Sequence, residues 1–340
     1  MEGKDVYMLR VSCMTYNQSA YITDTMNGFV MQQTDFPFVC TIVDDASTDG
    51  EQEVIREYVS ENFDLQDVSL AYVKDADYGQ VIFAKHKVND NCFFAIILLK
   101  ENHYSQRKSK APYLTEWMDT KYLAICEGDD YWINPQKLQR QVKFLEEHEE
   151  YSMCFHRAKV LLEIDHPVWL RCFDIENRDY SATELFANWI VPTASMVYRK
   201  QVLDYQVKGA ERLIYGDMVL IQKCAHTGKV RGIAEPYSVY RIQNSGITYE
   251  DVRYAGKVMG LPAHNECIKE NFPLIDQDLI GKAIAQNYCS RAMAYWHAGK
   301  RKLARSDFRA ARKYCPGALR RLVVKRIKRD IRRIIDRILG

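Results

Sequence analysis

The sequence predicts an α/β protein in which helices flank a mostly parallel β-sheet and a helical extension follows the sheet. Apolar runs of strand length alternate with helix-like stretches over about the first 130 residues, and the pattern becomes helical after Pro273. The 340 residues, 47% of them hydrophobic, suit either two domains or one large domain with an appendage. The chain has only 16 glycines and 9 prolines, and these low counts exclude the fibrous and low-complexity classes of protein.

Strands and helices are predicted in alternation along the first part of the chain. The predicted strands span residues 7–14, 38–43, 68–73 and 122–126, and the predicted helices span residues 20–33, 48–61 and 136–147. Ligands of such sheets bind beyond the carboxyl ends of the strands. Polar clusters occupy these ends, at residues 15–17, 44–45 and 127–130. We therefore expect a ligand site at this edge.

The run V-D-D-A-S-T-D-G at residues 43–50 directly follows a predicted strand. Its paired acids can accept hydrogen bonds from a base or from ribose hydroxyls. The alternative is a helix N-cap, since Asp45, Ser47 and Asp49 are all favourable capping residues. Two adjacent carboxylates exceed what one cap requires, which favours the binding interpretation.

The run E-G-D-D-Y-W at residues 127–132 also follows a predicted strand. Three carboxylates within four residues repel one another unless a cation or solvent compensates. Hard divalent cations bind carboxylates and retain phosphate oxygens as further ligands. The alternative is an acidic turn before a helix that starts near Pro135. A second acidic motif on another strand end favours a metal–diphosphate site.

Cysteine usage and hydropathy indicate a reducing, cytoplasmic environment. The ten cysteines form no C-x-x-C pair and mostly sit in apolar runs, so zinc binding is not expected. Neither His86 nor His103 has metal-ligand spacing. The best apolar run, residues 92–99, is too short to span a bilayer, and the N-terminus shows no signal peptide.

With these motifs in place, the chain resembles the inverting family 2 glycosyltransferases of the GT-A fold. The resemblance rests on S-C-M-T-Y-N at residues 12–17 and on the two acidic motifs, and it is most specific over residues 7–150. It is similar to the branch that builds bacterial surface polysaccharides, where E-N-H-Y-S at residues 101–105 also fits. The resemblance implies a nucleotide-sugar donor, with UDP the commonest carrier, and Mn²⁺ or Mg²⁺ as cofactor.

The resemblance also implies roles for individual residues. The residues it assigns to the nucleotide-sugar are Thr15, Tyr16, Asn17, Asp44, Asp45, Asp130 and Arg241. Glu127 and Asp129 take the two acidic positions of the metal-binding D-x-D motif, with Asp129 the direct ligand. Glutamate at the first position departs from the family's usual aspartate. Its longer side chain is expected to reach the metal through water. Gln243 stands where many relatives carry a histidine that contacts metal or diphosphate.

Asp217, in the run Y-G-D-M-V-L, matches the family's later acidic motif and is the candidate catalytic base. From the residues alone, Asp217 would be assigned as the cap of a helix that runs to residue 225. Upstream, the segment with Trp189 and Thr193 resembles the part of the family that lines the acceptor site. A buried core position for Trp189 is the alternative.

The implied function is transfer of a sugar from a nucleotide-diphosphate donor to a hydroxyl of a saccharide or lipid-linked saccharide, with inversion. A metal-dependent sugar nucleotidyltransferase is an alternative, but no Gly-rich, basic phosphate loop is present near the N-terminus. A non-catalytic nucleotide-sugar binding module is a further alternative. The retained acids Glu127, Asp129 and Asp217 speak against it, because a binder needs no base.

The predicted domains are residues 1–260 (GT-A domain), 261–316 (a tetratricopeptide-like helical hairpin) and 317–340 (a basic amphipathic helix). From residue 299 onward the chain carries a net charge of +13, against −11 for the rest. We expect the last helix to lie on an anionic membrane, at the inner face of the cytoplasmic membrane. Packing of its apolar stripe on the hairpin is an equal alternative. No nucleic-acid partner is expected, and the oligomeric state stays open.

Overall fold

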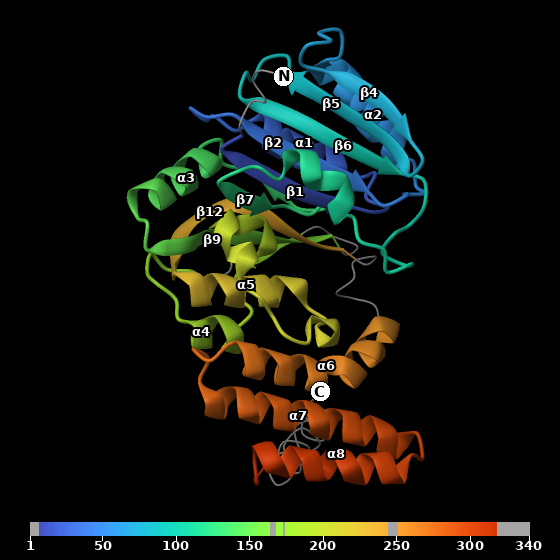
Figure 1. Cartoon of the computed structure of the whole chain (residues 1–340), viewed down its shortest axis with the longest axis vertical. Helices are drawn as coiled ribbons and strands as arrows, with labels where there is room; N and C mark the ends of the chain where they lie inside the picture. Colours follow the sequence, from blue (N-terminus) through green and yellow to red (C-terminus); the bar gives the residue numbers. More distant parts are fainter. Residues whose placement is uncertain (1–6, 164–167, 173, 244–250, 318–340) are drawn as a thin grey trace. The chain divides into compact units, whose positions relative to one another are not determined.

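The computed structural model describes residues 7–163, 168–172, 174–243 and 251–317. The chain divides into two compact units (Figure 1). Unit 1 comprises Met1–Ser181, Asn188–Tyr205 and Thr227–Asn244, and unit 2 comprises Ala182–Ala187, Gln206–His226 and Ser245–Gly340.

Unit 1 is built on a mixed sheet of 12 strands with a parallel centre. The four central strands are β6 (Cys92–Leu99), β2 (Phe38–Asp44), β1 (Leu9–Thr15) and β7 (Tyr122–Ile125), in this spatial order, and all three pairings between them are parallel. The predicted α/β class with a parallel sheet is thereby confirmed. Antiparallel strands on both sides of this centre make the sheet mixed.

Two apolar layers cover the central strands, because every residue of β2 is buried and successive side chains face opposite ways. Phe38, Cys40 and Ile42 pack in one core, which also contains side chains of α1 (Ile22–Val30), α2 (Glu51–Asn62) and α3 (Lys137–Glu147). Val39 and Val43 pack in the other, against the 3₁₀-helix η1 (Ala111–Trp117). Among the described residues of unit 1, the three α-helices thus share one face of the sheet.

One edge of the sheet differs from the prediction. The strand expected at residues 68–73 is instead β4 (Tyr72–Ala76), which forms an antiparallel hairpin with β5 (Gly79–His86). β5 pairs antiparallel with β6 on its inner side and with the short β3 (Phe63–Asp64) on its outer side. Gly79 is required here, because a Cβ at this position would overlap the backbone of Leu98. The prediction missed β5 and placed its partner strand too early.

The other half of the sheet brings the second acidic motif beside a late segment of the chain. β12 (Lys229–Gln243) runs parallel to β9 (Tyr151–Glu163) and pairs antiparallel with β8 (Tyr131–Trp132). β11 (Val197–Arg199) lies between β7 and β9, and β10 (Val168–Cys172) pairs with β9. The last residues of β12 therefore lie next to residues 127–130.

Unit 2 is helical. Its α-helices are α4 (Ala182–Ala187), α5 (Gly216–Thr227), α6 (Asp251–Asn271), α7 (Gln277–His297) and α8 (Arg301–Tyr314), with the 3₁₀-helix η4 (Ala210–Arg212) before α5. The helical pattern predicted after Pro273 is present as α7 and α8, joined at Gly299 with a φ of 73°. The helical region begins before the predicted residue 273, since α6 already precedes it. Pro262 lies inside α6, where a proline would ordinarily break a helix.

The predicted division at residues 260 and 316 stays a prediction. The basic helix expected over residues 317–340 lies, from residue 318 on, outside the described residues. Within the described parts of the chain, none of the helices combines the length and the apolar composition that a bilayer span needs.

Candidate functional site

The motifs at residues 12–17, 43–50 and 127–132 come together at the carboxyl ends of β1, β2 and β7. Thr15 ends β1 opposite Asp44 at the end of β2, and the backbone N–H of Gly128 donates to the carbonyl of Met14 at 3.2 Å. A side chain at position 128 would overlap Thr15 and Gln18. The predicted convergence of the polar strand ends is therefore present in the fold, and Gly128 allows the close approach.

Glu51 joins the first two motifs and was not identified from the sequence. This first residue of α2 is fully buried. Its carboxylate accepts from the backbone N–H of Gln18 and from the Ser47 hydroxyl, both at 2.8 Å, and from the Thr15 hydroxyl. Burial raises its pKa, and these hydrogen bonds oppose the shift. In the sequence, Glu51 has no feature beyond its place near a helix N-terminus.

Asn17 and Tyr16 occupy the turn after β1. Asn17 has a left-handed backbone with a φ of 54°, and its side-chain Oδ1 accepts from the N–H of Thr48 at 2.7 Å. Its own N–H donates to the Ser47 hydroxyl at 2.9 Å. Asn17 thus shapes the loop, whereas the Tyr16 ring is 45% exposed and free to meet a ligand.

Asp44 is fully buried at the end of β2. Its Oδ1 accepts from the N–H of Ser47 at 3.1 Å and from the Gln52 amide at 2.5 Å, whereas Oδ2 has no hydrogen-bond partner among the described residues. Burial raises the pKa of this carboxyl group. The unused acceptor is the kind of group that a hydroxyl donor would satisfy.

Asp45 is committed to the loop that follows β6. Its carboxylate accepts from the backbone N–H groups of His103 at 2.8 Å and Tyr104 at 3.0 Å, and Lys110 Nζ lies 2.9 Å from Oδ2. The Asn102 amide donates to the Asp45 carbonyl at 3.0 Å. The neighbouring Ala46 has a φ of 63°, a left-handed conformation that a glycine would adopt more easily.

Asp129 and Asp130 lie beside the end of β12. Asp129 is half-buried; its carboxylate accepts from the Gln243 amide at 3.0 Å, and the nearby Gln18 side chain favours its ionised form. Asp130 is buried and accepts from the backbone N–H of Arg241 at 2.9 Å. Burial raises the pKa of Asp129; burial, with the nearby charge of Asp129, raises that of Asp130 well above its usual range.

Thr25 and Gln243 are further residues of the site. Thr25, on α1, donates to the carbonyl oxygens of Gly128 and Asp130, at 2.9 and 2.7 Å, and so holds the acidic turn to the helix. The Gln243 amide contacts Asp129 from the position where the resemblance led us to look for a histidine. Thr25 carried no signal in the sequence, because it lies inside a predicted helix.

Arg241 is buried between two acids and two aromatic rings. Its guanidinium lies 2.8 Å from Asp24 Oδ2 and 3.1 Å from Glu163 Oε1, and it stacks 4.4 Å from the centre of the Tyr21 ring. Its Nε has no hydrogen-bond partner among the described residues. The guanidinium therefore offsets negative charge around the acidic turn.

The acidic turn fits a divalent cation of the kind that also binds phosphate. No group of three His, Cys, Asp or Glu side chains in the described parts of the chain forms a protein-only metal centre. A Mg²⁺-type ion, however, is commonly held by one or two carboxylates and by substrate phosphates. Glu127 and Asp129 supply such carboxylates, and burial raises the pKa of Asp129, whose charge a bound cation would stabilise.

The segment assigned to the acceptor is fixed to the acidic motif. The Trp132 indole N–H donates to the Ala194 carbonyl at 2.8 Å, which holds the 3₁₀-helix η2 (Thr193–Ser195), where Thr193 is half-buried. Trp189 is 51% exposed, and its ring meets that of Tyr240 edge to face at 5.5 Å between centres. Exposure favours a ligand-contacting Trp189 over a core residue.

Asp217 belongs to unit 2, in the first turn of α5, and is half-buried. Within that unit it lies near His264 of α6, whose Nδ1 accepts from the N–H of Ile214 at 3.1 Å. Burial lowers the pKa of His264 to about 4, and the charge of Asp217 opposes this shift.

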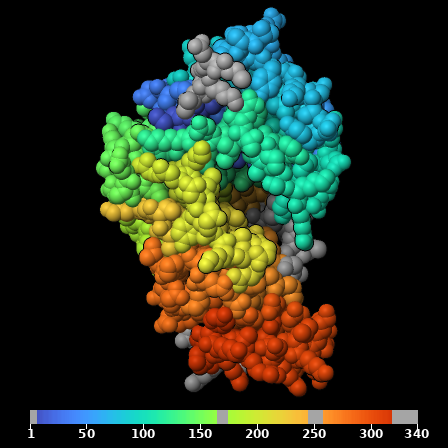
Figure 2. Space-filling model, viewed as in Figure 1, coloured from blue at the N-terminus to red at the C-terminus, as the bar shows by residue number. Residues whose placement is uncertain are grey.

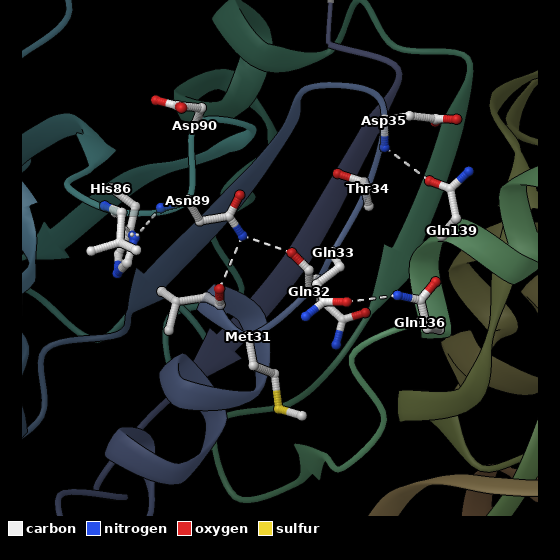
Figure 3. A pocket seen from close by; sticks show the side chains of 12 residues that line it. Met31, Gln32, Gln33, Thr34, Asp35, His86, Asn89, Asp90, Gln136 and Gln139 are labelled. Carbon is white, nitrogen blue, oxygen red and sulfur yellow. Dashed lines mark hydrogen bonds between the residues drawn. The ribbon is translucent and has the colours of Figure 1, made fainter.

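A separate hollow of 660 Å³ lies at the amino ends of β2 and β6 (Figure 3). Its amide side chains are largely used on one another and on the backbone: Gln136 donates to Gln33 at 2.8 Å, and Asn89 donates to the carbonyls of Val30 and Gln32. None of the predicted site residues lines this hollow.

Comparisons with known proteins give distant likenesses. No protein-family model matches the chain. The uncharacterized proteins Mb1547 of Mycobacterium bovis and Rv1520 of Mycobacterium tuberculosis are each 31% identical to it over 245 residues. The match covers 70% of this chain, and the chain spans 60% of the length of these relatives.

Two solved structures are similar in fold at low identity. Staphylococcus aureus TarS 1–349 in complex with UDP-GlcNAc is 14% identical, with a TM-score of 0.47, and the match covers 90% of this chain and 91% of TarS 1–349. The mannosyltransferase PcManGT of Pyrobaculum calidifontis, in complex with GDP-Man and Mn²⁺, is 16% identical, with a TM-score of 0.49 and coverage of 94% and 80%. TM-scores below 0.5 do not place this chain in either protein's family.

Proposed function

We propose that this chain is an inverting, metal-dependent glycosyltransferase. It transfers a sugar from a nucleotide-diphosphate donor, with UDP the first carrier to test, to a hydroxyl of a saccharide or lipid-linked saccharide in bacterial cell-surface polysaccharide synthesis. The proposal combines the motif resemblance with the geometry of unit 1.

The observation that carries the proposal is the packing of the acidic turn against the first strand end. Gly128 lies against Thr15 and Gln18, and the Gln18 side chain lies near Asp129. A nucleoside recognised at Thr15–Asn17 and Asp44 would therefore place its diphosphate next to Glu127 and Asp129. This is the order of parts that a nucleotide-sugar requires.

On the donor side, Tyr16 and the free oxygen of Asp44 contact the base and ribose in this proposal, while Asn17 and Asp45 hold the loops that form the site. Asp130, fixed by the backbone of Arg241, faces the donor sugar. Since the Arg241 guanidinium already pairs with Asp24 and Glu163, we propose that it balances the acidic turn rather than binding phosphate directly.

Glu127 and Asp129 would hold Mn²⁺ or Mg²⁺. When bound, such an ion supplies Lewis-acid stabilisation of the charge that develops on the departing diphosphate. Asp129 must be ionised to bind it, and the amide donors of Gln18 and Gln243 favour the ionised carboxylate.

On the acceptor side, Trp189 offers an exposed ring for stacking on a sugar, and Thr193 a hydroxyl. Asp217 accepts the proton of the attacking hydroxyl, so that a single in-line displacement at the anomeric carbon inverts its configuration.

A donor screen tests the proposed function. Purified full-length protein is incubated with a panel of nucleotide sugars in Mn²⁺ or Mg²⁺, and released nucleoside diphosphate is measured. Diphosphate release that depends on one sugar, on metal and on a saccharide acceptor supports the proposal. Release of pyrophosphate from a nucleoside triphosphate and a sugar phosphate would instead indicate a nucleotidyltransferase, and binding without turnover a binding module.

A further inference from the structure

The loop that follows β6 is held to the end of β2 by one residue, Asp45. Its carboxylate takes the backbone N–H groups of His103 and Tyr104, and it pairs with Lys110 at the far end of the loop. Asp45 is buried, with 3% of its surface exposed. Because charge-assisted hydrogen bonds are stronger than neutral ones, this arrangement fixes both ends of the loop.

His103 anchors the loop a second time. The Glu101 carbonyl can only accept, so His103 Nδ1 donates to it at 2.8 Å, and Nε2 accepts from the Tyr113 hydroxyl at 3.1 Å. The Tyr113 ring in turn stacks on Tyr78, with 4.0 Å between ring centres. His103 is therefore a buried, fully bonded residue, and its neighbour Tyr104 starts from a rigid point of the backbone.

Tyr104 directly follows this anchored histidine and is one of the most exposed aromatic residues among the described residues of unit 1. Its ring is 64% exposed, although its N–H is bonded to a buried carboxylate. The N–H of Asp45 donates to the carbonyl of Thr15, the residue before Tyr16, at 3.0 Å. Asp45 also accepts from the N–H of His103, the residue before Tyr104. Both tyrosines therefore directly follow a residue whose backbone is bonded to Asp45. The turquoise segment between β6 and β7 lies at the surface in Figure 2.

Two basic residues of the loop, Lys108 and Lys110, are paired with carboxylates. Lys108 lies 3.1 Å from Glu101, and Lys110 is bonded to Asp45. A loop that bound phosphate would keep such cations free for the ligand. The group that this loop presents is instead an aromatic ring, and an aromatic ring binds the flat faces of heterocyclic bases by stacking.

We infer that the Tyr104 ring stacks on the nucleobase of the donor, and that Asp45 acts as a positioning residue that holds Tyr104 in place. The inference rests on the proposed function and deepens it. The carboxylate of Asp45 already receives three donors, so its contribution to base recognition goes through the loop.

Binding of nucleoside diphosphates to the full-length chain tests this inference. Uridine, guanosine and adenosine diphosphates and inorganic pyrophosphate are titrated in Mn²⁺ into wild type and Tyr104→Ala. We expect the variant to bind the best of the three diphosphates about five- to 100-fold more weakly, the range that loss of a base–aromatic stack gives. Affinity for pyrophosphate, which has no base, should not change.

Conservative variants separate stacking from a structural effect. Tyr104→Phe and Tyr104→Trp should keep the wild-type affinity, and the fluorescence of the new tryptophan should be quenched by the nucleotide. Asp45→Ala should weaken binding no further when Tyr104→Ala is already present, because both changes remove one interaction. The exposed Trp296 of α7 provides a matched control, Trp296→Ala, with unchanged binding.

The results tell a failure of the stacking role apart from a failure of the proposed glycosyltransferase function. If wild type binds a diphosphate and Tyr104→Ala binds it equally well, the stacking role is wrong and the proposed function stands. A parallel loss of pyrophosphate affinity would also overturn it, since the loop would then act on phosphate. If wild type binds none of the diphosphates, both fall. Should Asp45→Ala fail to fold, the Ala and Phe variants at Tyr104 decide alone.

Discussion

Asp129 is the residue whose surroundings bear most directly on donor binding. It is half-buried, with an amide donor on either side, next to two further acids. Asp129→Ala should abolish turnover and weaken UDP binding much more in Mn²⁺ than in EDTA, because the carboxylate acts through the ion. Calorimetric titration of UDP under both conditions measures this. Asp35→Ala, at the opposite edge of the sheet, is the control. Equal UDP affinity with and without metal would refute the metal site.

Asp217 offers a test of the chemical step. Asp217→Asn should retain donor binding and lose about 100-fold or more in turnover, because only the transition state uses the proton transfer. Donor affinity and single-turnover rates measure the two effects separately. Asp278, also an acid in the first turn of a helix, provides the control Asp278→Asn with unchanged rates. A variant within a few-fold of the wild-type rate would rule out this base.

Lys137 gives the folded chain a predictable response to pH. It is fully buried above the Trp132 ring, 4.2 Å from its centre, and burial lowers its pKa to about 7. In the unfolded chain the pKa is about 10.4, so between these values the unfolded state binds more protons. The free energy of unfolding should therefore rise with pH across this window, by up to about 1.4 kcal/mol per pH unit from this group.

Lys137→Met removes the charge that must be desolvated. It should raise the free energy of unfolding below about pH 7 and flatten its rise above that pH. Urea denaturation at a series of pH values measures both effects. Lys143→Met, on the exposed side of the same helix, should leave the profile unchanged. An unaltered slope in Lys137→Met would show that the lysine stays protonated in the folded chain.

At the scale of elements, the α7–α8 hairpin is held by a paired charge as well as by small buried residues. Arg291 Nε and Nη2 donate to the two oxygens of Asp307, at 2.8 and 3.0 Å, and the Asp307 side chain is only 9% exposed. Ala285, Cys289 and Ala311 pack beside it. Such small side chains allow the two helices to approach closely, so the ion pair is largely shielded from water.

Asp307→Ala should destabilise this hairpin by about 1–3 kcal/mol, because it leaves a partly buried guanidinium without its carboxylate. The urea midpoint, followed by circular dichroism, measures the loss. The exposed pair Lys143–Glu147 gives the control Glu147→Ala, with a change within about 0.5 kcal/mol. Equal effects of the two variants would mean that the Arg291–Asp307 pair is solvated in solution.

At the scale of the whole molecule, charge is distributed unevenly along the chain. From residue 317 the sequence carries 9 Lys and Arg against 2 Asp, with apolar residues at 319, 323, 327, 331, 335 and 338. Such a segment combines apolar area with attraction to anionic lipid, worth about 1 kcal/mol per basic residue at the surface. We propose that it holds the enzyme at a membrane that carries its acceptor.

A chain ending at Pro316 should stay in solution, no longer sediment with anionic liposomes, and keep transfer to a water-soluble acceptor. Sedimentation of both forms at low and high salt measures the effect, with neutral liposomes as the control. If the full-length chain ignores anionic liposomes at low salt, the alternative of a helix packed on the hairpin is favoured.

Local patterns were enough to predict three of the four central strands and the strand-end motifs, whereas residues 92–99, which form β6, were noted only as an apolar run. Strands of a parallel centre are buried on both faces and read as continuous apolar runs, so β1, β2 and β7 were found nearly to the residue. The strand at the sheet edge was displaced, because β4 is largely exposed and carries little apolar signal. The helix α6 was hidden by Pro262.

The identity of the acidic residues at the strand ends was readable from the sequence, but their partners depended on the fold. Three of these pairings depend on contacts between distant segments of the chain. Glu51 joins Thr15 to Ser47, and Gln243 bonds Asp129. Asp45 binds the loop of Tyr104 and is not left open to a ligand. A sequence pattern records which groups are polar and where the chain turns. Tertiary packing decides which of those groups are used within the protein and which stay free for a ligand, because only packing sets distance and burial.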